Sequence, residues 1–292
     1  MRSQDNLRGM LSMLAAVATF SLMDACLKIL TPHYPPLQVA ALRGMCSWPL
    51  VTAWVLYDGG PRQLLRVRWP LHLLRGVLSI IMLASFAYAL RTLPLAETYS
   101  LFFVAPLLIT ALAALVLRER VDWRSWAAIL FGFGGTLIVL RPNGAGMLTL
   151  AGLAVLASAT GYAISAITVR IIGRSDSTQA MVFWMLTMTV VFALALGGRE
   201  WTPIRHEHWG VLVGLGVFGA IGQWAITDAF RRADASRIAP LEYTALVWGI
   251  ALDYALWNTL PDAVTLSGAA VIIAAGLYLI RRERVHVEAE HP

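Results

Sequence analysis

The chain has 292 residues, of which 58% are hydrophobic and only 14% are charged, with a mean hydropathy of +0.67. Soluble domains carry about 25% charged residues, so this composition excludes an ordinary soluble protein. The net charge of +6 does not indicate a nucleic-acid partner, because nucleic-acid binders gather their basic residues on one water-facing patch. Here the basic residues mostly lie in short segments between apolar runs.

Apolar runs long enough to cross a bilayer recur along nearly the whole chain. A transmembrane helix needs about 20 apolar residues, because each residue advances about 1.5 Å across roughly 30 Å of hydrocarbon. In chain order we predict ten such helices, at residues 10–30, 37–57, 70–90, 94–117, 123–140, 148–171, 179–197, 209–230, 238–258 and 264–281. The predicted fold class is therefore an all-α integral membrane protein of ten transmembrane helices.

The basic residues between these spans predict how the chain lies across the membrane. With the N-terminus inside, sixteen arginines fall in cytoplasmic segments, whereas only Arg91, Arg141, Arg199 and Arg205 fall on the opposite side. This asymmetry follows the positive-inside rule, and it holds through every loop only if all ten spans exist. We therefore predict a bacterial-type cytoplasmic (inner) membrane location, an uncleaved first helix and two cytoplasmic termini.

The two halves of the chain resemble each other at an offset of about 140 residues. In the best-matching stretch Gly76 aligns with Gly216, and Arg91 aligns with Arg231. The match is weak by identity but keeps one register through the hydropathy pattern. A chance alignment of two apolar segments is the alternative interpretation.

An internal repeat of this kind predicts the domain organisation and its symmetry. We interpret residues 1–143 as a first five-helix repeat, residues 144–282 as a second, and residues 283–292 as a polar cytoplasmic tail. Because five is odd, the second repeat must enter the membrane from the opposite side, so the two repeats are inverted. Inverted repeats are a recurring plan of secondary transporters, in which they allow alternating access to a central site.

One long segment carries a resemblance to a known family. It reads YALRTLPLAETYSLFFVAPLLITALAALVLRERVDWRSWAAILFGFGGTLIVL, and its partner segment runs from Asp228 to Leu279. Together they resemble the drug/metabolite transporter superfamily, and within it the ten-helix family with two EamA domains. The resemblance implies two EamA-like repeats and the transport of a small molecule, and it is nearest to the YddG-type exporters of aromatic amino acids.

Two residues of this segment are not repeated in the second half. Pro106 lies inside the fourth predicted span and Glu119 follows its end, whereas the equivalent positions hold Leu246 and Thr259. We expect Pro106 to kink the fourth span, because proline cannot donate the helical hydrogen bond. Any role of this proline and glutamate is therefore confined to one half.

Ionisable residues inside the spans are the first candidates for function. Each costs about 2.5 to 3.5 kcal/mol on insertion scales, so such residues usually face a cavity. Asp24, Lys28, Arg43 and Glu97 lie toward the outer side, Arg75, Asp228 and Glu242 toward the inner side, and Asp253 at the outer end of the ninth span. We interpret them as two polar layers that bind a zwitterion, exchange protons or gate a central cavity. The alternative is that Lys28, Arg75, Asp228 and Glu242 snorkel to the membrane surfaces.

Aromatic residues in the spans are the second set of candidates. Stacking on an aromatic ring holds a planar substrate, and we predict cavity roles for Tyr99, Trp224, Tyr243, Phe86, Tyr162 and Trp248. Tyrosine and tryptophan are also ordinary residues of the membrane interface, so packing or an interfacial belt is the alternative for each one.

The remaining motifs do not indicate an enzyme. The GLGVFG motif around Gly216 lies within a continuous apolar run, whereas a dinucleotide fingerprint needs a strand, a tight turn and a helix start. His206, Glu207 and His208 are neighbours in a loop without further metal ligands. We therefore expect no catalytic residue, metal or cofactor.

The sequence thus predicts a secondary transporter that exports amino acids, aromatic ones first. Its expected partners are the small-molecule substrate and the lipid bilayer, without nucleic acid, and a monomer is sufficient. A carrier of another metabolite or drug is the alternative within transport. A non-transporting membrane protein or an intramembrane enzyme is the alternative from a different class.

Overall fold

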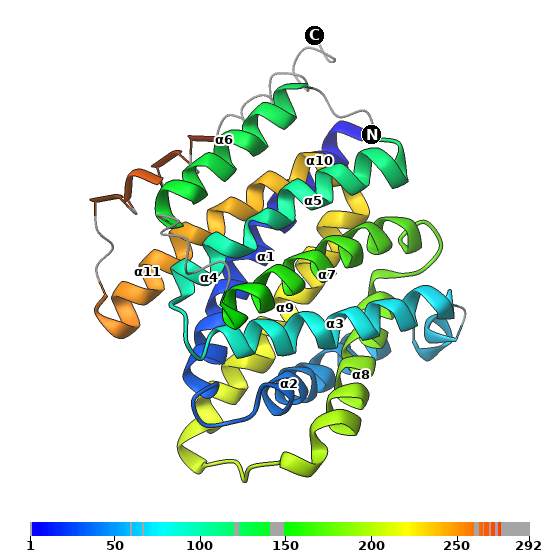
Figure 1. Cartoon of the computed structure of the whole chain (residues 1–292). Coiled ribbons are helices and arrows are strands. Elements are labelled where there is room, and N and C mark those ends of the chain that lie inside the picture. The colour runs from blue at the N-terminus through cyan, green and yellow to red at the C-terminus, as the bar shows by residue number, and fades with distance from the viewer. Residues whose placement is uncertain are drawn as a thin grey trace.

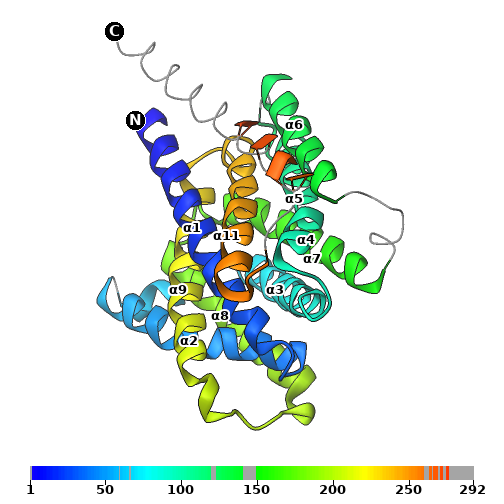
Figure 2. The ribbon, with the colours of Figure 1, turned by 90° about the vertical axis from the view of Figure 1, so that its left-hand side faces the viewer.

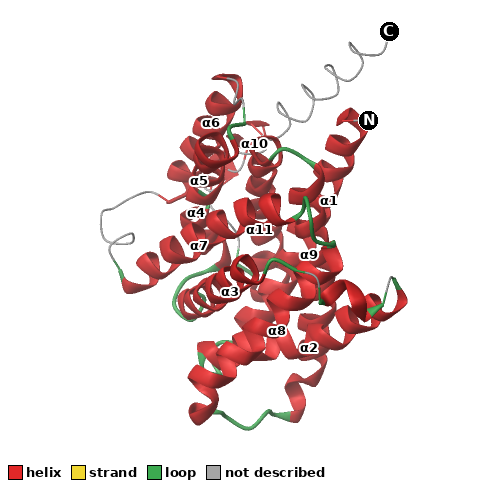
Figure 3. Ribbon diagram, turned by 90° about the vertical axis from the view of Figure 1, so that its right-hand side faces the viewer, coloured by secondary structure: helices red, strands yellow, loops and turns green. Residues whose placement is uncertain are grey.

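The computed structural model of the chain describes residues 2–58, 60–65, 67–119, 123–140, 149–259, 263–264, 266–268, 270–271 and 274–275. Within those ranges the regular structure is helical, with no strand (Figure 3). Six helices are long and apolar enough to cross a membrane, namely α1, α2, α3, α7, α8 and α9. The described part of the chain therefore has the helical structure and apolar helices of a membrane protein.

The helices follow one another without long loops in the described ranges. The α-helices are α1 (Arg2–Leu30), α2 (Pro36–Tyr57), α3 (Trp69–Ala89), α4 (Leu95–Phe102), α5 (Val104–Leu112), α6 (Trp123–Leu140), α7 (Leu150–Ile172), α8 (Thr178–Gly197), α9 (Trp209–Arg232), α10 (Ala235–Ile238) and α11 (Ala245–Trp257). Short 3-10 turns at Pro61–Leu64, Gly198–Glu200, His206–His208 and Ala239–Thr244 and a π-helical turn at Ala113–Leu117 join some of them.

The predicted spans coincide with these helices over most of the chain. The span predicted at 123–140 has the same bounds as α6. Two predicted spans are not continuous, because 94–117 is divided into α4, α5 and the π-helical turn, and 238–258 contains a 3-10 segment followed by α11. Most of the span predicted at 264–281 and the whole predicted tail lie outside the described residues.

The break between α4 and α5 has a local cause in the sequence. Proline carries no N–H, so Pro106 cannot donate to the carbonyl of Phe102, four residues earlier, and its ring crowds that carbonyl. Helix α4 ends at Phe102 and α5 begins two residues later. The interruption that Pro106 predicts is therefore present at the expected place.

The two broken segments end in the same way. Arg118 and Asn258, which are 140 positions apart, are the non-glycine residues with positive φ in the described ranges, both at 55°. After each of them an N–H reaches back six residues, from Glu119 to the carbonyl of Ala113 at 3.2 Å and from Thr259 to that of Asp253 at 3.2 Å. The shared ending satisfies helix carbonyls that would otherwise lack donors.

The most extensive helix packing joins the two halves of the chain. Helix α1 lies along α9, α3 along α7, and α2 along α8, and α1 and α9 run side by side in two views (Figures 1 and 2). Helix α6 lies at the opposite end of the molecule from α2 and α8. The interior between α1, α3, α7 and α9 is thus built from both halves.

Candidate functional site

A cavity of about 180 Å³ lies between the two halves of the chain. Its lining comes from helices α1, α2, α3, α4, α7, α8, α9 and α11 and from the 3-10 segment Ala239–Thr244. Its ionisable side chains include Asp24, Arg43, Arg75 and Glu242, and its aromatic ones are Phe20, Phe86, Tyr99, Phe102, Phe103, Tyr162 and Phe230. The lining is therefore mostly apolar with a few buried charges, as expected of a small-molecule site.

One group of polar residues in the cavity joins α1, α2, α4 and α9. The Tyr99 hydroxyl donates to Oδ2 of Asp24 at 2.9 Å. The Arg43 guanidinium donates to Oε1 of Gln223 at 3.3 Å and to the sulfur of Met23 at 3.0 Å. Because Asp24 and Arg43 carry opposite charges in one buried cluster, each offsets part of the other's desolvation cost.

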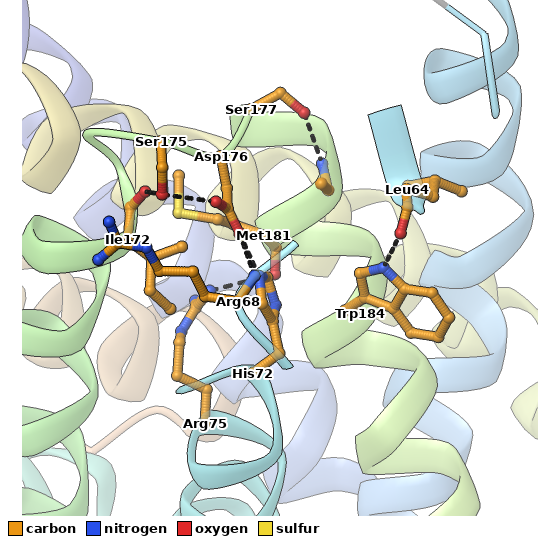
Figure 4. Close-up of polar contacts among 11 residues, drawn as sticks. Leu64, Arg68, His72, Arg75, Ile172, Ser175, Asp176, Ser177, Met181 and Trp184 are labelled. Carbon is orange, nitrogen blue, oxygen red and sulfur yellow. Dashed lines mark hydrogen bonds and ion pairs between the residues drawn. The ribbon is translucent and has the colours of Figure 1, made fainter. Parts of the chain in front are cut away.

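A second charge in the cavity has no such compensation. Arg75, on α3, is 1% exposed. Its guanidinium donates to the carbonyl of Met181 at 3.2 Å (Figure 4). It also contacts the sulfur of Met185 at 3.2 Å, while its Nε lacks a partner. No carboxylate of the described residues forms an ion pair with it within 4.0 Å. Arg75 is therefore enclosed in the protein and does not snorkel to a surface.

The cavity holds a second carboxylate on the segment that interrupts the ninth predicted span. Glu242 is 6% exposed and accepts a hydrogen bond from the Tyr162 hydroxyl at 2.8 Å. Tyr162 belongs to α7, so this contact also joins distant parts of the chain. Glu242 belongs to the predicted inner polar layer and Tyr162 to the predicted aromatic cavity residues, and both line the cavity.

Aromatic rings form much of the apolar wall. The Phe86 and Tyr99 rings are stacked with their centroids 6.4 Å apart, and the Phe102 and Tyr162 rings lie 5.4 Å apart. Phe86 also meets Phe102 edge-on at 5.8 Å. These rings offer flat apolar surfaces to a planar ligand beside the charged groups.

The two helix breaks meet at this site. Phe103, between α4 and α5, contacts Tyr243 edge-on with ring centroids 5.0 Å apart, and the two residues are 140 positions apart. Tyr243 is fully buried and packs behind Phe103, on Gly132 of α6, where an added Cβ would lie 2.8 Å from its ring. Tyr243 thus supports the wall but does not line the cavity, contrary to its predicted position.

Three further predicted residues lie away from the cavity. Trp224 and Trp248 are 42% and 41% exposed, which corrects their predicted position. Asp228 accepts hydrogen bonds from Ser12 at 3.0 Å and from Arg232 at 2.7 Å, outside the cavity. The side chain of Glu97 lies outside the described part of the chain.

Two ion pairs close the ends of the helices around the cavity. Lys28, near the end of α1, pairs with Asp253 of α11 at 2.8 Å and lies 4.2 Å from the ring centroid of Trp257. Arg170, near the end of α7, pairs with Asp234 at 2.7 Å and approaches Glu119 at 3.6 Å. The predicted topology places the first pair at the outer side and the second at the inner side.

Sequence reasoning missed Gln223 and Phe20 as cavity residues. Gln223 directly precedes Trp224, and one residue corresponds to 100° of rotation on a helix, so choosing Trp224 pointed to the wrong face of α9. Phe20 lies one helical turn before Asp24. The guanidinium carbon of Arg43 lies over the Phe20 ring, 5.6 Å from the ring centroid. The spacing of four from Asp24 is the signal that would have found it.

Comparison with known proteins gives matches over almost the whole chain. The family described as "EamA-like transporter family" matches residues 7–141 and 149–282. The pseudopaline exporter CntI of Pseudomonas aeruginosa is 26% identical, with 94% of this chain and 97% of that protein covered. The S-adenosylmethionine uptake transporter of Rickettsia prowazekii is 27% identical, with 98% and 96% covered.

Two further matches concern sequence and fold. The riboflavin transporter of Vibrio cholerae is 30% identical, with 95% of this chain and 94% of that protein covered. A protein of known crystal structure superimposes with a TM-score of 0.79, covering 97% of this chain and all of the other, at 22% identity. The fold is therefore shared with a solved structure over nearly its full length.

Proposed function

The chain belongs to the EamA-like transporter family, and on that basis we propose that it exports amino acids or metabolites built like them, aromatic ones first, by alternating access. Its named relatives belong to the drug/metabolite transporter superfamily, so the chain is a multi-pass membrane transporter of a small molecule. The finer resemblance to YddG-type exporters has no support among these relatives, whose names specify pseudopaline, S-adenosylmethionine and riboflavin.

The observation that carries the substrate class is the uncompensated guanidinium of Arg75 in the cavity. Arginine stays charged in proteins, so it cannot lower the cost of burial by losing its proton. A bound carboxylate would supply the missing counter-charge through charge-assisted hydrogen bonds. We therefore propose that Arg75 binds the carboxylate of the substrate.

The rest of the cavity suits the other parts of an amino acid. Asp24 receives a hydrogen bond on Oδ2 from Tyr99, and no described donor reaches its Oδ1, so the carboxylate has room for a substrate ammonium group. The rings of Phe86 and Phe102 would contact a planar side chain. An aromatic amino acid carries a carboxylate, an ammonium group and a planar ring. S-adenosylmethionine, with its adenine ring, carries the same three groups.

The alternating mechanism follows from the proposed symmetry. We propose ten helices in two inverted repeats, residues 1–143 and 144–282, in a bacterial-type inner membrane with both termini in the cytoplasm. Support comes from the offset of 140 that relates Phe103 to Tyr243, and from the ion pairs of Lys28 and Arg170 at the two ends. Opening one pair while the other stays closed would expose the cavity to one side at a time.

Transport by the purified protein in proteoliposomes tests the substrate class. We expect labelled tryptophan to enter, with competition by phenylalanine and S-adenosylmethionine and little by alanine. Arg75→Gln should weaken the apparent affinity roughly 10- to 100-fold, since a hydrogen bond to a charged group contributes about 1.5–3 kcal/mol. Arg75→Lys keeps the charge but not the planar guanidinium, so the apparent affinity should fall less than in Arg75→Gln.

Trp224→Ala is the matched control, because this tryptophan is exposed on α9 away from the cavity. It should leave the rate unchanged while Tyr99→Ala lowers it. Transport of riboflavin alone, unaffected by Arg75→Gln, would replace the proposed substrate with an uncharged one. Absence of flux for every amino acid tested would reject the amino-acid class.

A further inference from the structure

The two carboxylates of the cavity have unlike surroundings. Asp24 accepts a hydrogen bond from Tyr99 and has the guanidinium of Arg43 in the same cavity, which offsets only part of the cost of burying it. Glu242 forms no ion pair with any described cation within 4.0 Å, and the hydroxyl of Tyr162 is its hydrogen-bond donor. A single neutral donor does not offset the desolvation of a negative charge at this depth.

Arg75 and Glu242 are both buried without a counter-ion, but their chemistry differs. A guanidinium stays charged, whereas a carboxylate loses its charge by binding one proton. An ionised carboxylate inside a membrane protein costs several kcal/mol unless it is paired or hydrated. Binding a proton therefore removes the cost at Glu242, while no equivalent step exists at Arg75.

The ionisable groups near Glu242 come from several elements. Tyr162 of α7 contacts it directly, and Tyr243 precedes the end of the same 3-10 segment. Asp24 of α1, Arg43 of α2 and Arg75 of α3 line the same cavity, and none of them hydrogen-bonds or ion-pairs with Glu242. Of the other helices that pack on this segment, α5 carries no ionisable side chain, α6 carries Arg124, α10 carries Arg237, and α11 carries Asp253 and Tyr254.

The backbone around Glu242 allows it to change its surroundings. The residue lies in Ala239–Thr244, the 3-10 segment that separates α10 from α11. In transporters, interrupted helices of this kind hold the coupling-ion and substrate sites near mid-membrane. Movement of α11 relative to α10 would turn this segment and alter which side of the membrane the carboxylate meets.

We propose that Glu242 binds the proton whose downhill movement drives substrate export. The proton enters from the outer side, neutralises the carboxylate in the closed cavity, and leaves on the inner side when the carboxylate is hydrated again. This proposal rests on the proposed function for the identity of the substrate that is exported in exchange for the proton. The proton site itself is independent of which substrate is carried.

Infrared spectroscopy of the full-length protein in lipid tests the proton site without any substrate. A protonated carboxyl group in a dry site gives a C=O stretching band separate from carboxylates in water. We expect such a band to titrate with pH, to lose one component in Glu242→Gln, and to persist in Glu207→Gln, whose loop side chain is 64% exposed. Asp24 is the other buried carboxyl group of the cavity, and Asp24→Asn identifies any component that it contributes. A band that is identical in Glu242→Gln and wild type, or that is missing from the wild-type protein, would overturn the proposal.

Proteoliposomes with an imposed pH gradient test the coupling. Wild-type protein and Glu207→Gln should accumulate labelled tryptophan above its external concentration, and Glu242→Gln should not. In Glu242→Gln the exchange of labelled for unlabelled tryptophan should persist but lose its dependence on pH. Gradient-driven accumulation by Glu242→Gln equal to wild type would refute the coupling.

Separate readouts distinguish failure of the two proposals. If wild-type protein moves no tryptophan, the proposed substrate is wrong, and the infrared titration still decides whether Glu242 binds a proton. If Glu242→Gln does not fold, as judged by its melting temperature, Glu242→Asp keeps the acid and is expected to retain the band at a shifted position.

Discussion

Asp176 shows how individual polar contacts hold the membrane-surface end of the bundle together. It lies in the short connection between α7 and α8, and its carboxylate accepts hydrogen bonds from the His72 ring at 2.9 Å and the Arg68 backbone N–H at 3.1 Å (Figure 4). The Ser175 hydroxyl donates to its other oxygen at 2.6 Å. Burial alone would raise the pKa of Asp176, but these hydrogen bonds outweigh burial and lower it below its usual value.

This network predicts an acid-sensitive contribution to stability. A lowered folded-state pKa means that Asp176 stabilises the protein above its unfolded-state pKa of about 3.9, and that this contribution is lost as pH falls through the lower folded value. Asp176→Ala should cost about 2 kcal/mol at pH 7. Thermal unfolding in detergent between pH 7 and acidic pH should show a smaller difference from wild type as pH falls, and a constant difference would contradict the assignment.

The candidate site could be predicted only in part at this scale. The buried acids and bases Asp24, Arg43, Arg75 and Glu242 were identifiable, because a charge inside an apolar run needs a polar surrounding. Whether each one snorkels could not be predicted, since Arg75 and Asp228 both lie toward the inner ends of apolar spans. The position of each side chain depends on a partner more than 100 residues away, Met181 for Arg75 and Ser12 for Asp228.

At the scale of elements, glycine sets the closest approach between helices. At Gly216 of α9 an added Cβ would lie 2.6 Å from the carbonyl oxygen of Cys46 on α2. That atom is backbone, so a methyl group forces the two helices apart. At Gly210 on the same helix an added Cβ meets no atom within 4 Å.

This contrast predicts opposite effects of the same substitution on one helix. Gly216→Ala should destabilise the protein by about 1–3 kcal/mol through overpacking. Gly210→Ala should be neutral or slightly stabilising, because alanine favours helix more than glycine by about 1 kcal/mol. Melting temperatures of the two purified variants measure the difference, and equal values would show that α2 and α9 are not in close contact.

The positions of the helices were predictable, but only one of the two breaks was predicted. Pro106 signals the end of α4 through its missing N–H. The second break, at Ala239–Thr244, contains Pro240, which also lacks an N–H, but the predicted span at 238–258 ran through it because only Leu246, the equivalent of Pro106, was compared. Its place in the structure depends on packing against α1, α5 and α6, which a local pattern does not contain.

At the scale of the whole molecule, the two ion pairs of Lys28 and Arg170, near the ends of helices that line the cavity, predict how access is controlled. Lys28→Asp places a second carboxylate beside that of Asp253 and should lower transport several-fold, because like charges hinder closure of that end. The exchanged double variant, Lys28→Asp with Asp253→Lys, should recover transport. Initial rates in proteoliposomes check both.

An exposed ion pair provides the control for this experiment. Arg205 and Glu207 are 62% and 64% exposed, and their pair lies in the loop before α9. Since exposed pairs contribute little, Arg205→Asp should leave transport unchanged. A wild-type rate for Lys28→Asp as well would remove the first pair from the proposed mechanism.

The sequence by itself determined that lipid solvates most of this chain and where its helices run. Both follow from local composition, because the transfer of a side chain into hydrocarbon depends on its own chemistry. Only the tertiary structure decided which residues share the cavity. Lys28 and Asp253 meet across 225 positions, and such pairs depend on how each helix is rotated against helices of the other half. That rotation is set by packing over the whole interface, and no short stretch of sequence contains it.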